Sequence, residues 1–194
     1  MLMRVFRLAL VFFIAISLQS CSDSPAWHAG DITGMMPDLK FALTGPDGKA
    51  VEANSLHGKP ALIFFGFTSC PDVCPTTLTQ LSVVMKKLGS QADDIQVVLI
   101  TVDPDRDTPD VMKNYTASFG PWLLGLTGPE ASLAKLRETY GVYAAMESTP
   151  GDGINVMHSA AIFAFDRRGR ARLLIRDVTD SDAVVADIQQ LIQY

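Results

Sequence analysis

The feature that most constrains the fold of this 194-residue chain is an apolar run that leads directly into a cysteine-containing loop and then a helical pattern. Residues 61–67 read A-L-I-F-F-G-F, which is typical of a buried strand. Residues 75–87 carry apolar side chains at helical spacing. Cys70 and Cys74 lie in the loop between these two segments. Because ligands bind at strand-to-helix loops in sheets of this kind, we expect a functional site at the two cysteines.

Further strand and helix patterns alternate along the chain. The expected strands are 95–102, 123–126, 160–166 and 171–176, and the expected helices are 110–119, 129–140 and a last one from about 181. A hairpin at 41–51, with a G-P-D-G turn, precedes them. This order predicts an α/β fold of the thioredoxin type, with a mixed central sheet, helices on both of its faces and an added N-terminal hairpin. The length and the 48% hydrophobic content allow a single core.

The N-terminal residues 1–20 have the plan of an export signal, with Arg4 and Arg7 followed by an apolar run over 8–16. That run is shorter than the roughly 20 residues that span a bilayer. Residues 18–21, L-Q-S-C, resemble a bacterial lipoprotein cleavage box, which implies a lipid on Cys21. An uncleaved anchor is the alternative. Both interpretations predict a protein of the bacterial cell envelope that is anchored in a membrane and faces the periplasm.

Residues 21–36 are small, polar and without periodicity, so we expect a tether there and a domain over 37–194. The net charge is −5 and there is no basic run, so nucleic acid is not an expected partner. Removal of residues 1–20 would make the chain more acidic still, because it removes two arginines. No pattern indicates an obligate oligomer, and we expect a monomer.

Cys70 and Cys74 are the only thiols left if Cys21 carries a lipid, so they are expected to act as a pair. The start of the following helix favours a thiolate, which predicts a lowered cysteine pKa. Three chemistries can use two sulfurs four residues apart. They are a structural disulfide, which would be weak in so short a loop, reversible thiol–disulfide exchange, and binding of a soft metal such as Cu(I).

An imidazole would complete a three-coordinate copper site with the two thiolates. His28 falls in the expected tether and His57 in a polar loop, where solvated side chains are usual. His158 directly precedes the expected strand 160–166, where thioredoxin-type folds bring a loop against the cysteines at the helix start. By spacing alone, a structural role is the more common one for such a histidine.

The chain resembles the Sco/SenC family of copper proteins of cytochrome oxidase assembly. The resemblance is carried by an ordered set of short blocks between about Pro37 and the C-terminus. The blocks are G-K-P at 58–60, F-G-F-T-S-C-P-D-V-C-P-T-T-L at 65–78, T-V-D-P-D-R-D-T-P at 101–109, G-L-T-G at 125–128, Y-G-V at 140–142 and H-S at 158–159.

The resemblance implies that Cys70, Cys74 and His158 bind one copper ion, as Cu(I) or Cu(II). It also implies a copper chaperone rather than an enzyme. Such a chaperone takes copper from a periplasmic donor and delivers it to the dinuclear site of cytochrome c oxidase subunit II, or to another copper-protein client. The alternative is a periplasmic thiol–disulfide oxidoreductase that reduces the client's cysteines and has no need of His158. A thiol peroxidase of the same fold is a third interpretation.

Three further residues are singled out by the resemblance. Asp72, between the cysteines, and Asp103 match the family pattern, and their expected roles are tuning the site or docking a partner. Loop capping and simple surface charge are the alternatives. Met157 stands where many members have an aspartate before the ligand histidine, so the chain lacks a negative charge there. We hypothesise a shifted preference toward Cu(I), although Met157 filling a gap without binding copper is the commoner role.

Overall fold

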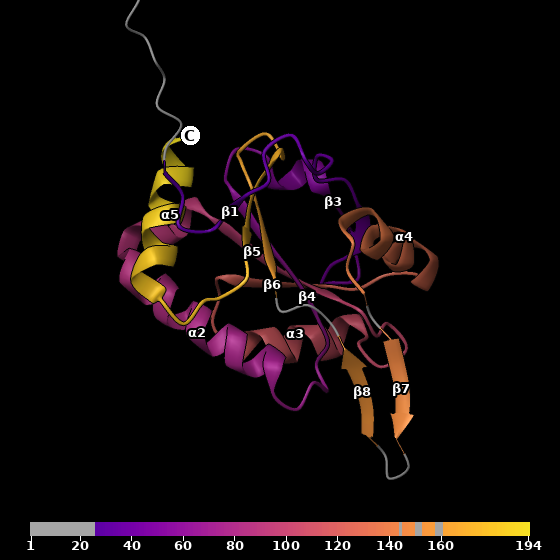
Figure 1. The fold of residues 1–194 in the computed structure, drawn as a ribbon. Coiled ribbons are helices and arrows are strands. Elements are labelled where there is room, and N and C mark those ends of the chain that lie inside the picture. The colour runs from indigo at the N-terminus through magenta and orange to yellow at the C-terminus, as the bar shows by residue number, and fades with distance from the viewer. Residues whose placement is uncertain (1–25, 144, 150–152, 158–160) are drawn as a thin grey trace, which may run out of the picture.

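The computed structural model describes residues 26–143, 145–149, 153–157 and 161–194, and for 145–149 and 153–157 it describes the backbone alone. A six-stranded sheet in the order β1-β10-β9-β4-β5-β6 forms the centre (Figure 1). Its strands are β1 (Gly30–Asp31), β4 (Ala61–Gly66), β5 (Gln96–Thr101), β6 (Leu123–Leu126), β9 (Ile162–Phe165) and β10 (Ala171–Ile175). β4 is parallel to β5 and antiparallel to β9, which confirms the predicted mixed sheet.

The helices in the described part of the chain are α2 (Val73–Leu88), α3 (Pro109–Ala117), α4 (Glu130–Tyr140) and α5 (Ser181–Gln193). Helices cover both faces of the sheet, as two neighbouring residues of β4 show. Successive side chains of a strand point to opposite faces. A side chain at Gly66 would meet the sulfur of Cys74 in α2. The ring of Phe65 instead contacts Tyr140 of α4, with 6.4 Å between ring centroids. The predicted arrangement of helices is therefore confirmed.

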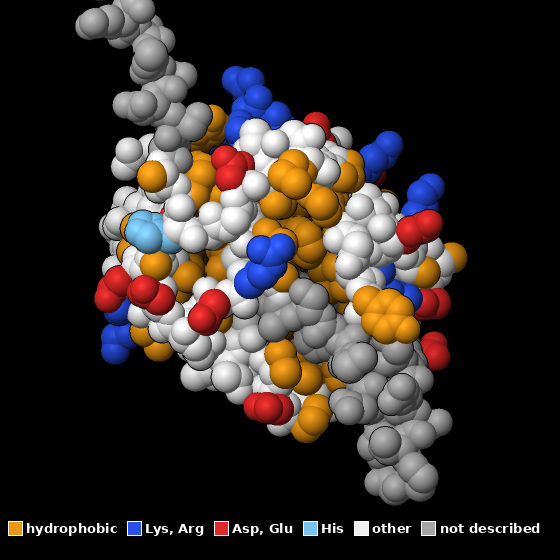
Figure 2. Space-filling model, viewed as in Figure 1, with side chains coloured by type: hydrophobic (Ala, Val, Ile, Leu, Met, Phe, Trp, Pro, Cys, Tyr) orange, Lys and Arg blue, Asp and Glu red, His pale blue; other side chains and the backbone are white. Residues whose placement is uncertain are grey.

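The core lies along the central strands. Every residue of β4 is buried, as expected for a strand covered on both faces. Outside this core, the face drawn in Figure 2 carries charged side chains of both signs with apolar side chains between them. Exposed apolar groups scattered in this way are normal for a folded protein.

The predicted N-terminal hairpin is present as β2 (Ala42–Thr44) and β3 (Ala50–Glu52), which pair in antiparallel. The short helix η1 (Ala53–Leu56) follows it, and η2 (Gly89–Asp94) follows α2. Thr44 also forms an isolated bridge with Thr127, which comes directly after β6. The hairpin is thereby joined to the edge of the main sheet.

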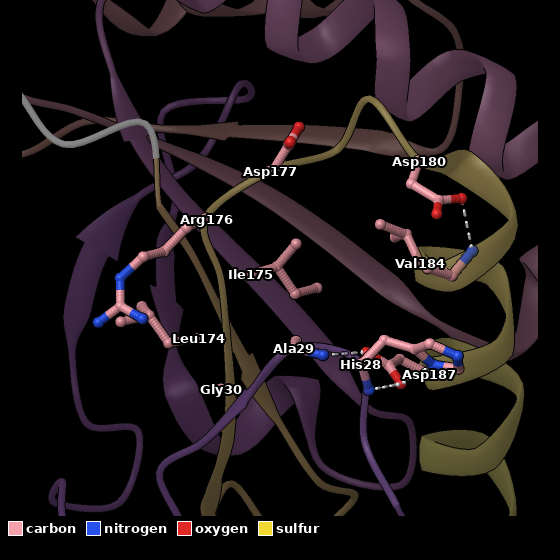
Figure 3. A pocket seen from close by; sticks show the side chains of 11 residues that line it. His28, Ala29, Gly30, Leu174, Ile175, Arg176, Asp177, Asp180, Val184 and Asp187 are labelled. Atoms are coloured by element: carbon pink, nitrogen blue, oxygen red, sulfur yellow. Dashed lines mark hydrogen bonds and ion pairs between the residues drawn. The ribbon is translucent and has the colours of Figure 1, made fainter.

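Residues 27–31, called the strap below, pack on the folded body although they fall within the expected tether. β1 pairs with β10 at the edge of the sheet. The backbone N–H groups of His28 and Ala29 donate to the buried carboxylate of Asp187 in α5, at 2.9 and 2.8 Å (Figure 3). The strap closes one side of a surface pocket of about 450 Å³. The folded part therefore includes residues before Pro37 in this structure.

One hairpin was missed by the sequence patterns. β7 (Ala145–Thr149) pairs with β8 (Gly153–Met157) in a separate two-stranded sheet. Strand 145–149 reads A-M-E-S-T and lacks the apolar and polar alternation that would have indicated it. The P-G-D-G sequence at 150–153 is typical of a turn and was the available signal. No helix in the described ranges is long and apolar enough to cross a membrane.

Candidate metal centre

The two cysteines lie where β4 passes into α2. Cys70 is in the connecting loop and half-buried, whereas Cys74 is the second residue of α2 and fully buried. The backbone N–H of Cys74 donates to the sulfur of Cys70 over 3.4 Å. This contact holds the Cys70 sulfur against the first turn of the helix, beside Cys74. Both residues are thiols in the structure and not a disulfide.

Gly66, the last residue of β4, makes room for the inner sulfur. A Cβ atom at this position would lie 2.9 Å from the sulfur of Cys74, closer than such atoms pack. Pro75 follows Cys74 in the first turn of α2, where proline is tolerated because the N–H groups there have no partner within the helix. The Cys74 sulfur thus packs against a residue without a side chain, Gly66, and the proline that follows Cys74 stiffens the first turn of α2.

Burial raises the pKa of the Cys74 thiol, and the neighbouring Cys70 and Asp107 raise it further. The prediction of a lowered cysteine pKa was wrong for Cys74. The start of a helix does favour a thiolate, but here the loss of water around a fully buried sulfur outweighs that effect. Burial therefore favours the protonated form of the Cys74 thiol.

Asp107 links the cysteine loop to β5 by hydrogen bonds, although the sequence patterns indicated only a helix start at that position. Its carboxylate is fully buried and accepts three hydrogen bonds. The N–H and hydroxyl of Thr68 donate to it at 3.0 and 2.5 Å, and the hydroxyl of Thr101 donates at 2.6 Å. Thr68 precedes Cys70 by two residues and Thr101 ends β5. The carboxylate therefore ties the cysteine loop to the neighbouring strand.

The two aspartates singled out by the resemblance lie in different environments. Asp103 is buried, its N–H donates to the hydroxyl of Thr101 at 2.9 Å, and its carboxylate is ion-paired with Arg106. Asp72 is exposed at the N-cap of α2, where its side chain does not cap the helix and instead accepts from the hydroxyl of Thr76 at 3.3 Å. Asp72 is thus open to a partner molecule, whereas Asp103 is occupied within the fold.

Tyr115 of α3 is a further neighbour of the thiol pair that no sequence pattern indicated. Burial raises the pKa of its phenol, and the next largest contributions come from Cys74 and Cys70. Residues such as Tyr115 and Asp107 reach the site only through the packing of α3 and the loop before it. The T-V-D-P-D-R-D-T-P block was the available signal for Asp107.

His158, predicted as the third ligand, lies outside the described residues, as does Cys21. Of Met157 the structure describes the backbone, as the last residue of β8. Within the described ranges, no three histidine, cysteine or carboxylate side chains come together as a metal site. The described donors are thus the two sulfurs, whose softness suits Cu(I) and other soft metals.

Comparison with known proteins identifies relatives over most of the chain. The sequence model of the SCO1/SenC family matches residues 35–193. An SCO2-like protein of Rickettsia prowazekii is 39% identical over 132 residues, which are 67% of this chain and 64% of that relative. The match thus spans slightly less than two thirds of the relative's length.

Solved structures show the same fold. The structure of ScoI from Bradyrhizobium japonicum with copper bound is 43% identical, covers 79% of this chain and 98% of its own, and superimposes with a TM-score of 0.74. BsSco, described as a member of the Sco family of cytochrome c oxidase assembly proteins with a disulfide switch, is 21% identical, covers 86% and 98% of the two chains, and has a TM-score of 0.68. At that identity the second likeness shows the fold alone, which is thioredoxin-like.

Proposed function

The chain belongs to the SCO1/SenC family, and from this premise we propose that it is a copper chaperone. One copper ion is bound by the thiolates of Cys70 and Cys74 and the imidazole of His158. The ion comes from a periplasmic donor and is passed to the dinuclear copper site of cytochrome c oxidase subunit II. No substrate is turned over, so the protein is a carrier.

The observation that carries this proposal is the pairing of the two sulfurs at the start of α2. The 3.4 Å contact from the Cys74 N–H to the Cys70 sulfur holds both donors at one point of the fold. Two thiolates in this arrangement suit copper in its reduced form, and binding replaces their protons by the metal. The copper-bound ScoI relative supports the same assignment.

The assignment of His158 as third ligand is supported by the short segment of chain between His158 and β9. His158 precedes Ile162 by four residues, and Ile162 pairs with Phe64 of β4. β4 ends at Gly66, beside the Cys74 sulfur. Only a few residues of chain therefore separate His158 from the end of β4, where the thiols lie. Each residue spans at most about 3.6 Å, so this short segment limits their distance.

Thiol–disulfide exchange is the second candidate function, and the same pair of sulfurs favours it. Oxidation of Cys70 and Cys74 to a disulfide would remove both thiolates and make copper binding depend on redox state. The two functions differ in their need for an imidazole, because exchange between thiols and disulfides does not require one.

The experiment is Cu(I) competition with a chromogenic chelator, for the reduced protein and for Cys70→Ala, Cys74→Ala and His158→Ala. His28→Ala and His57→Ala are matched controls that remove an imidazole elsewhere. We expect one tightly bound ion, lost with either cysteine and weakened with His158→Ala alone among the histidine variants. Weak binding that is indifferent to His158, together with a readily reduced disulfide, would assign the pair to exchange chemistry instead.

The same proposal includes the location of the protein. Lipid on Cys21 anchors a monomeric domain to a membrane of the cell envelope, facing the periplasm. Mass spectrometry of the N-terminal peptide tests this, with cleavage before Cys21 and a diacylglycerol modification as the expected result. An unmodified Cys21 in an intact leader would support the uncleaved anchor.

A further inference from the structure

The hydroxyl of Tyr115 is buried and has no hydrogen-bond partner among the residues that the structure describes. Its ring is held in place by an edge-to-face contact with Phe119, with 5.3 Å between centroids. Buried hydroxyl groups in folded proteins nearly always have a partner, since losing water without replacement is unfavourable. A hydroxyl left in this state calls for an explanation, and its surroundings supply one.

The phenol lies within electrostatic reach of the sulfurs of Cys74 and Cys70 and of the carboxylate of Asp107. Burial, and then these three neighbours in that order, raise its pKa. A tyrosine hydroxyl carries its proton at neutral pH even at its ordinary pKa of about 10, so it can donate. The Asp107 carboxylate already accepts three hydrogen bonds from Thr68 and Thr101. The two sulfurs are acceptors within the same reach, and they become stronger acceptors when they lose their protons to a metal.

We propose that the Tyr115 hydroxyl is a hydrogen-bond donor to the sulfur pair of Cys70 and Cys74 when these are thiolates bound to copper. The inference rests on the proposed function. A thiol sulfur is a weak acceptor, whereas a thiolate carries the charge that strengthens such a bond. The donor is thus without a partner among the described residues of the metal-free protein and finds one in the loaded protein. Tyr115 is accordingly a positioning residue, which acts on copper through its ligands.

This assignment predicts that removing the Tyr115 hydroxyl affects the copper-loaded and the metal-free protein in opposite directions. Removing the hydroxyl should weaken the copper-loaded state, because partners of metal ligands stabilise and orient those ligands. The same change should not weaken the metal-free protein, and should stabilise it if anything, because it removes a buried hydroxyl that has no partner among the described residues. A purely structural role for the hydroxyl predicts a loss of stability in the metal-free state instead.

The test is Tyr115→Phe in the full chain, purified in detergent and reduced, with Tyr143→Phe as control. Tyr143 is 69% exposed, so its hydroxyl has water available and its removal should be silent. For Tyr115→Phe we expect Cu(I) affinity to fall on the order of 10-fold. We also expect the Cu(II)–thiolate absorption band to move to longer wavelength and the melting temperature of the metal-free protein to stay equal or rise.

The outcomes distinguish the proposed donor role of Tyr115 from the proposed function as a copper chaperone. Tight copper binding by the wild type, with an affinity and an absorption band for Tyr115→Phe that match both wild type and Tyr143→Phe, would overturn the inference and leave the chaperone proposal standing. A lower melting temperature of metal-free Tyr115→Phe would assign the hydroxyl to the fold and also overturn it. A wild type that holds no copper would overturn the proposed function and this inference with it.

Discussion

At the scale of single residues, Asp166 shows how a buried charge is held where β9 turns into β10. Its carboxylate is 3% exposed and accepts from the N–H groups of Arg168 and Arg170 and from the guanidinium groups of Arg170 and Arg172. Burial alone would raise its pKa, but the hydrogen bonds from Arg170, Arg168 and Arg172 outweigh burial and hold the pKa below its ordinary value. The ionised form is therefore favoured by folding.

The sign of the pH dependence follows from this lowered pKa. Stability from Asp166 is fully present above the ordinary carboxyl pKa of about 4 and is lost as the pH falls through the lower value of the folded state. Asp166→Asn should therefore reduce the free energy of unfolding by about 3 kcal/mol at pH 7, and the difference from wild type should shrink below about pH 4. Urea unfolding at several pH values measures this. Asp94→Asn, which changes an exposed carboxylate, is the control, and a difference between Asp166→Asn and wild type that does not change with pH would contradict the assignment.

Met157 stands where the resemblance to the Sco/SenC family implies an aspartate in many members, and its effect on the copper potential can be tested. A carboxylate next to the imidazole of His158, the proposed ligand, would stabilise the more highly charged Cu(II), so Met157→Asp should lower the Cu(II)/Cu(I) potential. Met157→Leu keeps an apolar side chain of similar size and should leave the potential near the wild-type value. Redox titration of the loaded protein measures both variants. An unchanged potential in Met157→Asp would remove the idea that this position sets the preference for Cu(I).

At the scale of elements, the contact between β4 and α2 depends on the absence of a side chain at Gly66. A methyl group there would lie 2.9 Å from the Cys74 sulfur and 3.1 Å from Leu99. Gly66→Ala should therefore destabilise the protein by about 1–3 kcal/mol and displace the buried thiol, with weaker Cu(I) binding as a result. Gly30→Ala is the matched control, because its methyl group meets nothing closer than 3.5 Å. Chemical unfolding and Cu(I) competition on both variants measure the effects, and equal values for the two would show that α2 can shift without cost.

The elements that the sequence predicted are those with a strong periodic signal. β4 was recognised from its continuous apolar run, because the strand is buried along its whole length. α2 was recognised from apolar residues at helical spacing, because one face of the helix is buried. β1 was not predicted, since two residues are too few to show a period and the pairing with β10 is a long-range contact. β7 was missed because its residues do not alternate. Such strands are set by tertiary pairing and not by local preference.

The candidate site divides in the same way. Cys70 and Cys74 were predicted, because two thiols at one helix start are a local pattern. Asp107 was read as part of a helix start, and the helix does begin there, with Thr108 as its N-cap. Its role beneath the cysteine loop depends on Thr68 and Thr101, which lie 39 and 6 residues away in the chain. A carboxylate that joins a loop to a neighbouring strand can be recognised only once the sheet is assembled.

At the scale of the whole molecule, the strap would limit the distance between the thiol pair and the proposed lipid anchor on Cys21. With lipid on Cys21, a tether reaching to residue 36 could span about 50 Å, at the length of an extended chain. The strap holds residues 27–31 on the domain, through β1 and through the bonds to Asp187. Residues 22–26 then span about 17 Å at most. Under the proposed lipid anchoring, the strap would keep the domain and the thiol pair close to the membrane surface.

Asp187→Ala tests this arrangement, because it removes the acceptor of the N–H groups of His28 and Ala29. Hydrogen bonds to a charged group contribute roughly 1.5–3 kcal/mol, so amide hydrogen exchange in the strap should accelerate by about tenfold or more. Asp180→Ala is the control, since it removes a carboxylate from the start of the same helix, where it caps Ala183 and does not contact the strap. Exchange measured by mass spectrometry on the full chain in detergent should show faster labelling of 27–31 in Asp187→Ala alone. Equal labelling of the strap in the two variants would mean that β1 holds it without Asp187, and that Asp187 does not control the length of the tether.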